Sequence, residues 1–544
     1  MKVATTVRSP TTLVTVGFVL LLLVSGNVTF FNKLAEIYPP VVENLAFLFS
    51  VVTLTFGLIL VVVAVFSCLL PIRWVLSLLI ALTMGAGYFS DNYGVVLDTT
   101  MIQNILETDL NESRALATNS FFLRAFLFGL LPILVLWRLP AGSLTIRELV
   151  FGNLRLAIAG VALICVCLGS FSAQYASFFR EHKSVRFYNN PVFPVYSIVK
   201  YAMESFKYQG YEGLDVVMAD AHLPSSDTGR ELIIMVVGET ARRDRFSLNG
   251  YHRDTNPRLA SEPGVISYSN ISACGTSTAV SVPCMFSELK AKDFFPESTM
   301  QRENILDVLQ RSGVNVLWRD NNSDSKGVAT RLTYEDFRRP DRNPACDSEC
   351  RDVGMLQGLQ EYVDSTNGDV LIVLHQMGSH GPAYHERYPA EFERFKPACQ
   401  SAELHTCSKE EIDNAYDNTI LYTDYFLSEV ISFLKHNSDY ETAMLYVSDH
   451  GESLGENGLY LHGLPMMLAP REQLEVPVIV WVGGASDIEL ASALEQSSVE
   501  NSHDTVFSSL ALAFELISKI TDEVTPLFSL HEKISEGKPA VVGE

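Results

Sequence analysis

Acidic and imidazole side chains follow several predicted strands at the points where the apolar runs end. The run "ELIIMVVGET" leads into Glu239, "TAMLYVSDHGES" into Asp449 and His450, and "GDVLIVLHQMGSHG" into His375 and His380. Parallel strands present their carboxyl ends at one edge of a sheet, which is where ligands bind in open α/β folds. Two carboxylates with neutral imidazoles suit Zn²⁺. We therefore predict a zinc site at this edge, and interpret His375, which lies nearer the strand interior, as a packed histidine.

A second chemical signal is the segment Ser272 to Leu289, "SACGTSTAVSVPCMFSEL", which has five hydroxyl side chains in its first ten residues. A Ser or Thr hydroxyl becomes a nucleophile when a metal or a base activates it. If the hydroxyls sit at the start of a helix, the free N–H groups there would attract an anion such as a phosphoryl group. A turn that merely caps a helix would have the same composition. Spacing alone leaves three candidates open: Thr276, Ser277 and Thr278.

The cysteines indicate an oxidising compartment. Three of the nine lie inside apolar runs, and the other six form close couples after residue 270: Cys274 with Cys284, Cys346 with Cys350, and Cys399 with Cys407. Paired cysteines of this kind are typical of disulfides in exported domains. Six cysteines allow fifteen connectivities, so nearest-neighbour pairing is a hypothesis. A structural zinc cluster would need C-x2-C pairs, which the sequence lacks. A bridge between Cys274 and Cys284 would fix the hydroxyl-rich loop over the metal.

The elements that must position these residues are short strands alternating with helices. Five continuous apolar runs of strand length, including "VNVLWRDN" and "VPVIVWVGG", are typical of strands buried on both faces. Helical stretches between them include 302–311 and 415–435. This alternation predicts an α/β domain over 230–544, with a mainly parallel sheet flanked by helices.

The N-terminal part predicts a transmembrane domain over 1–175. Five apolar runs approach the roughly 20 residues that a spanning helix needs: Thr12–Phe31, Leu45–Leu69, Ile72–Tyr88, Phe121–Leu139 and Leu156–Phe171. Basic residues precede the first run and separate the second from the third and the fourth from the fifth. By the positive-inside rule these segments are cytoplasmic, so the other loops and everything after Phe171 lie on the outer side of the membrane. We interpret the first run as a retained anchor because it is long and has no A-x-A exit.

A linker with interfacial helices is predicted over 176–229. Its Phe and Tyr residues are interleaved with Arg and Lys, and Pro191 and Pro194 are expected to divide it into short pieces. This mixture suits helices that lie in the lipid headgroup zone, although an ordinary linker packed on the domain explains it equally well.

Charge excludes one class of partner. The first 175 residues hold 9 basic and 8 acidic side chains, which leaves 31 basic and 55 acidic ones in the remainder. An acidic exported domain favours solubility and argues against a nucleic-acid partner, because a phosphate backbone needs the opposite sign.

Five motifs together carry a family resemblance. The segments "VVGET", "CGTSTAVSVPCMFS", "NNSDSKG", "LHQMGSHGPAY" and "VSDHGESLGENGLYLHG" resemble those of the lipid A phosphoethanolamine transferases, a family that includes the mobile colistin-resistance enzymes. The resemblance covers essentially the whole chain. It implies a five-helix transmembrane bundle followed by a periplasmic catalytic domain of the alkaline-phosphatase and sulfatase type.

The resemblance also implies roles for individual residues. Thr278 matches the family nucleophile, and zinc would be held by Glu239, Thr278, Asp449 and His450, with a second zinc possible. The substrate-binding positions are His380, His462, Lys326, Asn322 and Glu452 in the domain, and Asn104, Thr108 and Glu112 in the outer loop, where they are associated with the lipid donor. Other histidines, including His503, receive no role.

We therefore expect a monomeric, multi-pass enzyme of the bacterial inner membrane with its catalytic domain in the periplasm. It would transfer phosphoethanolamine from phosphatidylethanolamine to a lipid A phosphate through a phosphorylated threonine, and so confer resistance to polymyxin and cationic peptides. Three alternatives remain: a transferase with another donor or acceptor, such as phosphoglycerol or a core sugar; a hydrolase of the phosphatase or sulfatase type; and a metal-binding sensor without activity.

Overall fold

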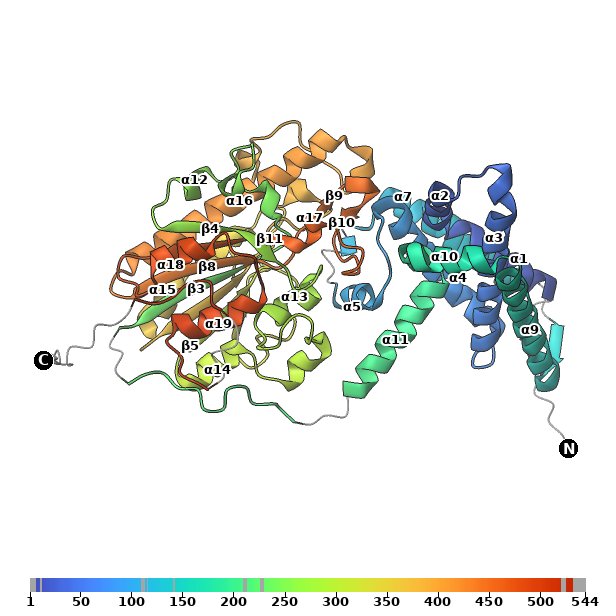
Figure 1. The fold of residues 1–544 in the computed structure, drawn as a ribbon, viewed down its shortest axis with the longest axis horizontal. Coiled ribbons are helices and arrows are strands. Elements are labelled where there is room, and N and C mark those ends of the chain that lie inside the picture. Colours follow the sequence, from blue (N-terminus) through green and yellow to red (C-terminus); the bar gives the residue numbers. More distant parts are fainter. Residues whose placement is uncertain are drawn as a thin grey trace, which may run out of the picture. The chain divides into compact units, whose positions relative to one another are not determined.

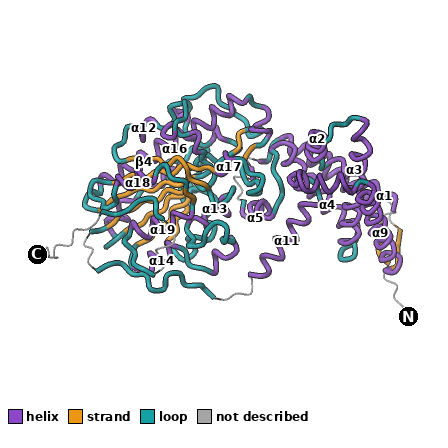
Figure 2. The backbone as a smooth tube through the Cα atoms, in the orientation of Figure 1, coloured by secondary structure: helices purple, strands orange, loops and turns teal. Residues whose placement is uncertain are grey.

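The computed structural model describes residues 6–9, 12–108, 113–114, 116–139, 142–208, 213–225, 229–519 and 525–531. The chain divides into two compact units, each described by itself. One is helical and comprises Met1–Lys207 with Gly455–Leu468. The other is an α/β unit and comprises Tyr208–Leu454 with Ala469–Glu544 (Figures 1 and 2).

The helical unit consists mainly of long apolar helices. Its elements are β1 Thr6–Ser9, α1 Thr12–Ser25, α2 Val28–Ile37, α3 Val42–Phe66, α4 Ile72–Tyr93, α5 Thr99–Glu107, α7 Asn119–Arg124, the π-helix η1 Ala125–Leu130, α8 Leu131–Arg138, β2 Gly142–Thr145, α9 Ile146–Ser170, α10 Ser172–Glu181, the 3₁₀ helix η2 Lys183–Tyr188, α11 Val192–Tyr208, and, in the inserted segment, the 3₁₀ helix η10 Glu456–Gly458 and β10 Tyr460–Leu461. Within the described residues four helices are long and apolar enough to cross a membrane, and five if the bent pair of α1 and α2 counts as one span.

The first predicted span differs from the structure in its shape. Instead of one run from Thr12 to Phe31, α1 and α2 meet at an angle of 63°. Asn27 lies at the break, where its Nδ2 donates to the Leu23 carbonyl at 3.1 Å and to the Asn190 carbonyl at 2.7 Å. In turn, the backbone N–H of Asn190 donates to Asn27 Oδ1 at 2.8 Å. The asparagine pair therefore satisfies the polar groups that the bend exposes.

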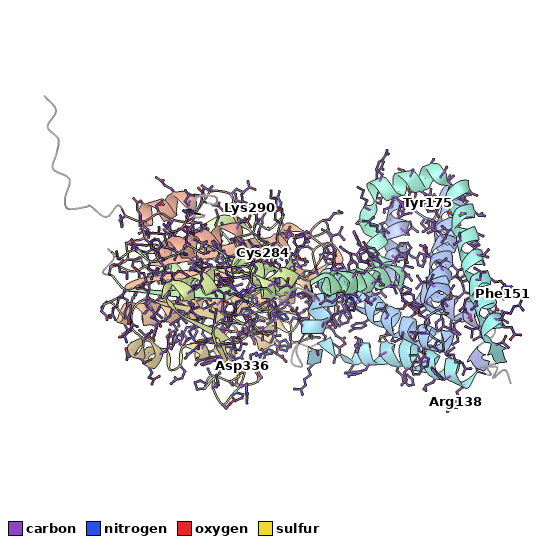
Figure 3. The ribbon with its side chains drawn as sticks, turned by 90° about the horizontal axis from the view of Figure 1, so that it is seen from below. Arg138, Phe151, Tyr175, Cys284, Lys290 and Asp336 are labelled. Atoms are coloured by element: carbon purple, nitrogen blue, oxygen red, sulfur yellow. A yellow bond between two sulfur atoms is a disulfide. The ribbon has the colours of Figure 1, made fainter. Side chains whose placement is uncertain are left out.

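Small residues let two of the long helices approach closely. A Cβ added to Gly57 of α3 would lie 2.9 Å from the Gly160 carbonyl oxygen, and one added to Gly160 of α9 would lie 2.7 Å from that of Gly57. Such contacts are how apolar helices associate where no water is present to drive them together. Arg138 and Tyr175 lie at opposite ends of this unit in Figure 3, because the long helix α9 runs between them.

The predicted linker is more helical than expected. Pro191 precedes α11 and Pro194 lies in its first turn, so neither divides the 17-residue helix. A first-turn proline is tolerated because the N–H that it lacks would have no partner inside the helix.

The α/β unit is built on one eight-stranded sheet with the order β12-β4-β11-β8-β3-β7-β5-β6. Its strands are β3 Glu231–Gly238, β4 Val265–Ser272, β5 Asn315–Asp320, β6 Thr333–Asp336, β7 Val370–His375, β8 Glu441–Ser448, β11 Glu475–Val482 and β12 Asn501–Ser502, with a short β9 Ser453–Leu454 outside the sheet. The neighbours from β8 to β6 are parallel, whereas β11 is antiparallel to both β8 and β4. The mainly parallel sheet is confirmed, with β11 as the reversed strand.

Helices cover both faces of this sheet (Figure 1). They are α12 Pro257–Ala260, α13 Thr278–Met285, α14 Ile305–Ser312, α15 Leu359–Ser365, α16 Lys409–His436, α17 Arg471–Leu474, α18 Leu490–Gln496 and α19 Asp504–Ala513. The 3₁₀ helices are η3 Arg243–Arg245, η4 Ser247–Asn249, η5 Pro296–Gln301, η6 Asp352–Leu356, η7 Tyr384–Glu386, η8 Ala390–Phe392 and η9 Leu404–Thr406. Alternate residues of β3 pack with side chains of α13, α14 and α19 in one core, and α16 covers the opposite face. All eight β3 residues are buried, which explains its continuous apolar run.

Three disulfides connect nearest neighbours, as hypothesised: Cys274–Cys284, Cys346–Cys350 and Cys399–Cys407. Cys284, labelled in Figure 3, is buried.

Candidate metal and nucleophile site

The carboxyl ends of four parallel strands deliver polar residues to one edge of the sheet. β3 ends one residue before Glu239, β8 one residue before Asp449, and β5 two residues before Asn322, while β7 leads into the loop that carries His380. These strands are adjacent in the sheet, so their loops meet. Thr240, which follows Glu239, has a φ of 58°, an uncommon conformation for a β-branched residue. Its N–H donates to Asp449 Oδ1 at 3.0 Å and ties the β3 loop to the β8 loop.

Glu239, Asp449 and His450 form a buried cluster of possible metal ligands. One ligand atom from each lies within 4.8 Å of the others. His450 Nε2 is 3.6 Å from Glu239 Oε1 and 3.3 Å from Asp449 Oδ2. Its other ring nitrogen, Nδ1, lies 2.9 Å from the Gly451 carbonyl, so that this nitrogen carries the proton and Nε2 offers its lone pair to the cluster.

Thr278 completes this cluster with an oxygen. Its Oγ1 donates to Glu239 Oε2 at 3.2 Å and lies 3.5 Å from His450 Nε2. Thr278 is the first residue of α13, and the preceding N-cap residue, Ser277, forms no side-chain hydrogen bond to the helix. Backbone N–H groups at a helix start attract anions such as phosphate. Thr278, one of the three candidate hydroxyls, therefore places its oxygen against the cluster.

Burial and mutual repulsion perturb the acids of this site. Burial raises the pKa of Asp449 to about 7, and the neighbouring Glu239 carboxylate adds to the effect. Burial lowers the pKa of His450, but the Asp449 and Glu239 carboxylates outweigh burial and raise it. Two carboxylates held together in a dry pocket repel each other unless a cation lies between them.

The residues fit a bound divalent cation. Asp449 Oδ2 is buried, and no hydrogen bond to it is found in the described part of the chain. Two carboxylates, one imidazole and one hydroxyl offer four ligand atoms of the kinds that tetrahedral zinc accepts. A cation in this position explains both the lack of a hydrogen bond to Asp449 Oδ2 and the close approach of two carboxylates of like charge.

The loop after β5 brings Asn322 against the same cluster. Asn322 Nδ2 donates to Glu239 Oε2 at 2.7 Å and to the Gln376 carbonyl at 2.7 Å. Further along this loop Asp324 and Lys326 have positive φ, at 109° and 51°, a region that glycine adopts freely but other residues rarely do. Strained backbone of this kind persists only where surrounding contacts hold it, and it concentrates at functional sites. Lys326 contributes a cation to this loop.

The loop that carries His380 lies directly on Glu239. A Cβ added to Gly378, whose φ is 51°, would lie 2.8 Å from the Glu239 carbonyl oxygen, so a glycine is needed for this approach. Ser379 N–H donates to the same oxygen at 3.0 Å. His380 is mostly buried, and its carbonyl accepts from Arg387 Nε at 2.7 Å.

Comparisons with known proteins find family matches in both units of the chain. Residues 231–515 match the Sulfatase family model, and residues 54–206 match the model for phosphoethanolamine transferase EptA/EptB. The chain is 42% identical to phosphatidylethanolamine transferase Mcr-1 of Escherichia coli, over 92% of this chain and 94% of that protein. It is 37% identical to phosphoethanolamine transferase EptA of E. coli K12, over 89% and 90%.

A solved structure extends the match to both units. The integral membrane lipooligosaccharide phosphoethanolamine transferase A of Neisseria meningitidis superimposes with a TM-score of 0.88 at 30% identity, covering 94% of this chain and 97% of that one. The chain belongs to the phosphoethanolamine transferase family. The predicted family membership is thereby confirmed.

Glu452 is a further buried carboxylate of this transferase. Its Oε1 accepts from Tyr384 Oη at 2.7 Å, and its carbonyl accepts from Arg242 Nη1 at 3.2 Å. Burial raises the pKa of Glu452 to about 8, which the hydrogen bond from Tyr384 only partly offsets.

The remaining predicted substrate residues belong to the helical unit. Asn104 and Thr108 lie at the end of α5, where the Asn104 carbonyl accepts from both Thr108 N–H and Thr108 Oγ1. His462 lies in the inserted segment of the same unit, next to Gly463, whose added Cβ would lie 2.6 Å from Met101 Cε and 3.6 Å from Asn104 Nδ2. Glu112 lies outside the described residues.

Sequence reasoning missed three positioning residues in the transferase. Asp352 accepts from Asn321 Nδ2 at 2.8 Å, Met377 N–H at 2.8 Å and Gly378 N–H at 3.2 Å, and so joins the β5 loop to the β7 loop. Asp320 accepts from the Asn322 N–H at 2.8 Å and pairs with the ring of His375 at 3.0 Å.

The third is His503, which had been given no role. Its Nδ1 accepts from Cys274 N–H at 3.2 Å, and its Nε2 donates to the Ser448 carbonyl at 2.9 Å. His503 therefore connects the segment Ser272 to Leu289, which carries Thr278, to the end of β8. Nothing in the local sequence marks it, because both partners are distant along the chain.

Proposed function

We propose that this protein transfers phosphoethanolamine from phosphatidylethanolamine to a phosphate of lipid A, with Thr278 as the nucleophile. The observation that carries the proposal is the position of Thr278 Oγ1, 3.2 Å from Glu239 Oε2 and 3.5 Å from His450 Nε2 at the first residue of α13. The names of the relatives, which describe phosphatidylethanolamine and lipooligosaccharide phosphoethanolamine transferases, support the donor and the class of acceptor.

The first half-reaction forms a bond between Thr278 Oγ1 and the phosphorus of the donor. The bond from phosphorus to the glycerol oxygen breaks, and diacylglycerol leaves. Glu239 Oε2, which accepts the hydrogen bond of the Thr278 hydroxyl, is positioned to receive its proton, and this proton ends on the glycerol oxygen. In the second half-reaction an oxygen of a lipid A phosphate attacks the phosphorus and the bond from phosphorus to Thr278 Oγ1 breaks. The proton that the attacking phosphate monoanion loses ends on Thr278 Oγ1.

We assign a zinc ion to Glu239, Thr278, Asp449 and His450, because their donor atoms suit its preference for four mixed nitrogen and oxygen ligands. When bound, zinc would lower the pKa of the threonine hydroxyl and offset negative charge on the phosphoryl oxygens. The start of α13 and Lys326 supply further positive charge for those oxygens. Asn322 orients Glu239 through its 2.7 Å hydrogen bond. His380, His462 and Glu452 are the remaining candidates for substrate or a second zinc, and Asn104, Thr108 and Glu112 for the donor headgroup.

The setting of the reaction is part of the proposal. We infer five membrane spans in the bacterial inner membrane and a periplasmic catalytic domain, supported by the positive-inside pattern, the three disulfides and the integral-membrane relative. Confining donor, acceptor and enzyme to one surface raises their effective concentration. Adding a cationic group to lipid A would weaken the binding of polymyxin and cationic peptides.

Intact-protein mass spectrometry after exposure to phosphatidylethanolamine tests the proposal. Wild type should gain one phosphoethanolamine group on Thr278 and should shift the mass of lipid A by the same group. Thr278→Ala should do neither, whereas Thr276→Ala, which changes a neighbouring hydroxyl of the same loop, should retain the modification. Release of free headgroup to water without a modified acceptor would indicate a hydrolase and overturn the proposal. A modified core sugar or a phosphoglycerol product would overturn the choice of acceptor or donor.

A further inference from the structure

The turn that follows β3 carries backbone strain next to two proposed metal ligands. Thr240 comes directly after Glu239, is fully buried, and has a φ of 58°. The left-handed region is unfavourable for a β-branched side chain, which crowds the backbone there, and few such residues adopt it. A residue in this conformation is retained only where surrounding contacts hold it. Contacts from other elements must therefore stabilise this turn.

The strained conformation directs two polar groups of Thr240 to the metal cluster at once. Its N–H donates to Asp449 Oδ1 at 3.0 Å, and its Oγ1 donates to Glu239 Oε1. Rotation about the N–Cα bond changes the angle between the N–H and the side chain, so the two contacts depend on φ. Relaxation of φ to a negative value would separate them. The strain at Thr240 is therefore linked to the positions of both carboxylates.

Three neighbouring segments hold the backbone of this turn. The Glu239 carbonyl accepts from the Ser379 N–H at 3.0 Å, in the loop after β7. The Ala241 N–H donates to Ser448 Oγ at 2.8 Å, at the end of β8. The third segment is α16, which contacts the turn through the side chain of Tyr416.

The hydroxyl of Tyr416 bridges two backbone groups of the turn. Tyr416 Oη donates to the Thr240 carbonyl at 2.7 Å and accepts from the Arg242 N–H at 2.9 Å. A phenol hydroxyl is both a donor and an acceptor, so one atom satisfies both groups. The two groups lie on either side of Ala241, and any change in the backbone between them would break the bridge. This hydroxyl therefore favours the conformation in which Thr240 is strained.

Tyr416 is itself fixed in place by its surroundings. It is fully buried in α16. Its ring packs edge-on against the ring of Tyr384, with the centroids 5.4 Å apart. Tyr384 Oη donates to Glu452 Oε1 at 2.7 Å, in the loop after β8. A side chain held in this way can fix the groups that it contacts.

We propose that Tyr416 is a positioning residue for the metal site, acting through the strained conformation of Thr240 on Glu239 and Asp449. Residues that orient the ligands of a metal typically change metal affinity or activity 10- to 100-fold when they are substituted. The inference rests on the metal site of the proposed function and adds a residue that lies outside the five family motifs.

Tyr416→Phe in the full-length chain tests this role, because it removes only the hydroxyl. The Kd for zinc, measured by competition with a chromogenic chelator, should rise roughly 10- to 100-fold. In the metal-free protein the amides of Thr240 and Arg242 should exchange hydrogen faster, as measured by mass spectrometry. The control is Tyr422→Phe, at a buried tyrosine of the same helix whose hydroxyl makes no hydrogen bond within the described residues. It should change neither quantity.

Two outcomes of this experiment would overturn the role of Tyr416. One is an equal effect of Tyr416→Phe and Tyr422→Phe, including no effect of either. The other is a change in zinc affinity without a change in exchange, or the reverse, because the proposed route links the two.

A second substitution separates positioning from general stability. Glycine adopts positive φ readily, so Thr240→Gly removes the strain, although it also removes the Oγ1 contact to Glu239. If Tyr416 acts by holding the strained conformation, Tyr416→Phe should weaken zinc binding much less in a Thr240→Gly background than in wild type. Equal fold-changes in the two backgrounds would show that Tyr416 contributes only general stability and would overturn the inference.

The same samples distinguish this inference from the proposed function. If wild type binds zinc but leaves Thr278 unmodified by phosphatidylethanolamine, while the variants follow the expected pattern, the proposed transfer falls and the role of Tyr416 stands. If wild type modifies Thr278 but Tyr416→Phe binds zinc normally, the role of Tyr416 falls alone. A wild-type protein that binds no zinc would overturn the metal assignment and this inference together.

Discussion

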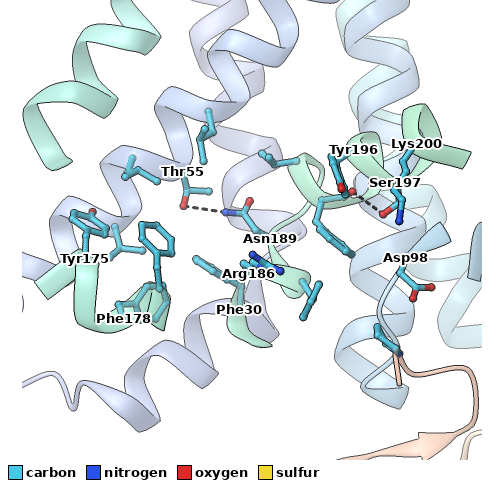
Figure 4. Close-up of a pocket in the computed structure, with 18 of the residues that line it drawn as sticks. Phe30, Thr55, Asp98, Tyr175, Phe178, Arg186, Asn189, Tyr196, Ser197 and Lys200 are labelled. Carbon is cyan, nitrogen blue, oxygen red and sulfur yellow. Dashed lines mark hydrogen bonds between the residues drawn. The ribbon is translucent and has the colours of Figure 1, made fainter. Parts of the chain in front are cut away.

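The sheet edge of the α/β unit and the cavity of the helical unit hold their polar groups in opposite ways. At the sheet edge the candidate site residues contact one another: Glu239 alone accepts from Thr278 and Asn322. In the cavity of about 650 Å³ among α2, α3 and the segment from α10 to α11, Asn189 Oδ1 accepts no hydrogen bond from the described residues, and Arg186 only stacks on the ring of Phe187 (Figure 4). A site that must hold reacting atoms in one geometry uses redundant hydrogen bonds, whereas the apolar walls of a cavity can define its shape without fixing the polar groups in it.

The comparison predicts its largest effect at the proposed metal ligands. Glu239→Gln removes one of two carboxylates from the cluster and also the acceptor of the Thr278 hydrogen bond. We expect at least about 10³-fold loss of transfer, as for residues that act as a unit in other active sites, together with loss of bound zinc measured by elemental analysis. Asp439→Asn, at an exposed acid of the same unit, is the matched control. Full zinc content with normal transfer in Glu239→Gln would remove this residue from the site.

A smaller effect is expected at Asp352, which contacts the loop that carries His380. Asp352→Asn places an amide where the Met377 and Gly378 N–H groups donate, so the loop that carries His380 should shift. Misplacement by about 1 Å costs roughly 10²-fold in rate. Zinc content should remain at the wild-type level, because no ligand changes, and kcat should fall more than KM rises. The exposed Asp364→Asn serves as the control, and loss of zinc in Asp352→Asn would show a general structural role instead.

Positioning residues such as Asp352 could not be predicted from the sequence, whereas most strands of the sheet could. Continuous apolar runs identify β3, β5, β7, β8 and β11, and the residues after the parallel strands converge because the sheet forces them to. The reversed direction of β11 has no local signal, since a buried strand has the same composition in either direction. β4 was missed because its burial alternates along the strand, unlike that of β3.

Long-range polar partners were missed for a different reason. His503 contacts Cys274, 229 positions away, and Asn27 contacts Asn190, 163 positions away. A single sequence shows each of these residues only as an isolated polar side chain, and the family resemblance named the reacting residues but not their supports.

At His503 we expect an effect of intermediate size, a dependence of folding stability on pH. Burial lowers the pKa of His503 from its ordinary 6.5 to about 4, with the hydrogen bond to the Ser448 carbonyl opposing the shift. Between these values the unfolded chain binds a proton at this residue and the folded chain does not. Stability is therefore fully present above pH 6.5 and falls as pH decreases toward 4, by up to about 3 kcal/mol.

The measurement is the apparent Tm of the full chain in detergent from pH 7.5 to 4.5. His503→Gln retains a donor and an acceptor but does not titrate, so its Tm should fall less steeply with acid than that of wild type. His222→Gln, at a residue whose ring lies at the exposed surface, controls for loss of any histidine. Parallel curves for wild type and His503→Gln would show that His503 is charged in the folded state.

The smallest effect is expected in the helical unit, where the side chain of Asn27 forms the hydrogen bonds at the bend between α1 and α2. Asn27→Leu removes the donors to the Leu23 and Asn190 carbonyls and the acceptor for the Asn190 N–H. Hydrogen bonds between apolar helices contribute only about 0.6 to 2 kcal/mol each, because the separated helices also find partners. The apparent Tm should therefore fall by a few degrees while zinc content and Thr278 modification persist. Asn44→Leu, which removes one local exposed hydrogen bond, should have no such effect. If Asn27→Leu instead abolished modification of Thr278, the contrast between a redundantly held site and a loosely held helical unit would fail, because the bend would then determine the chemistry.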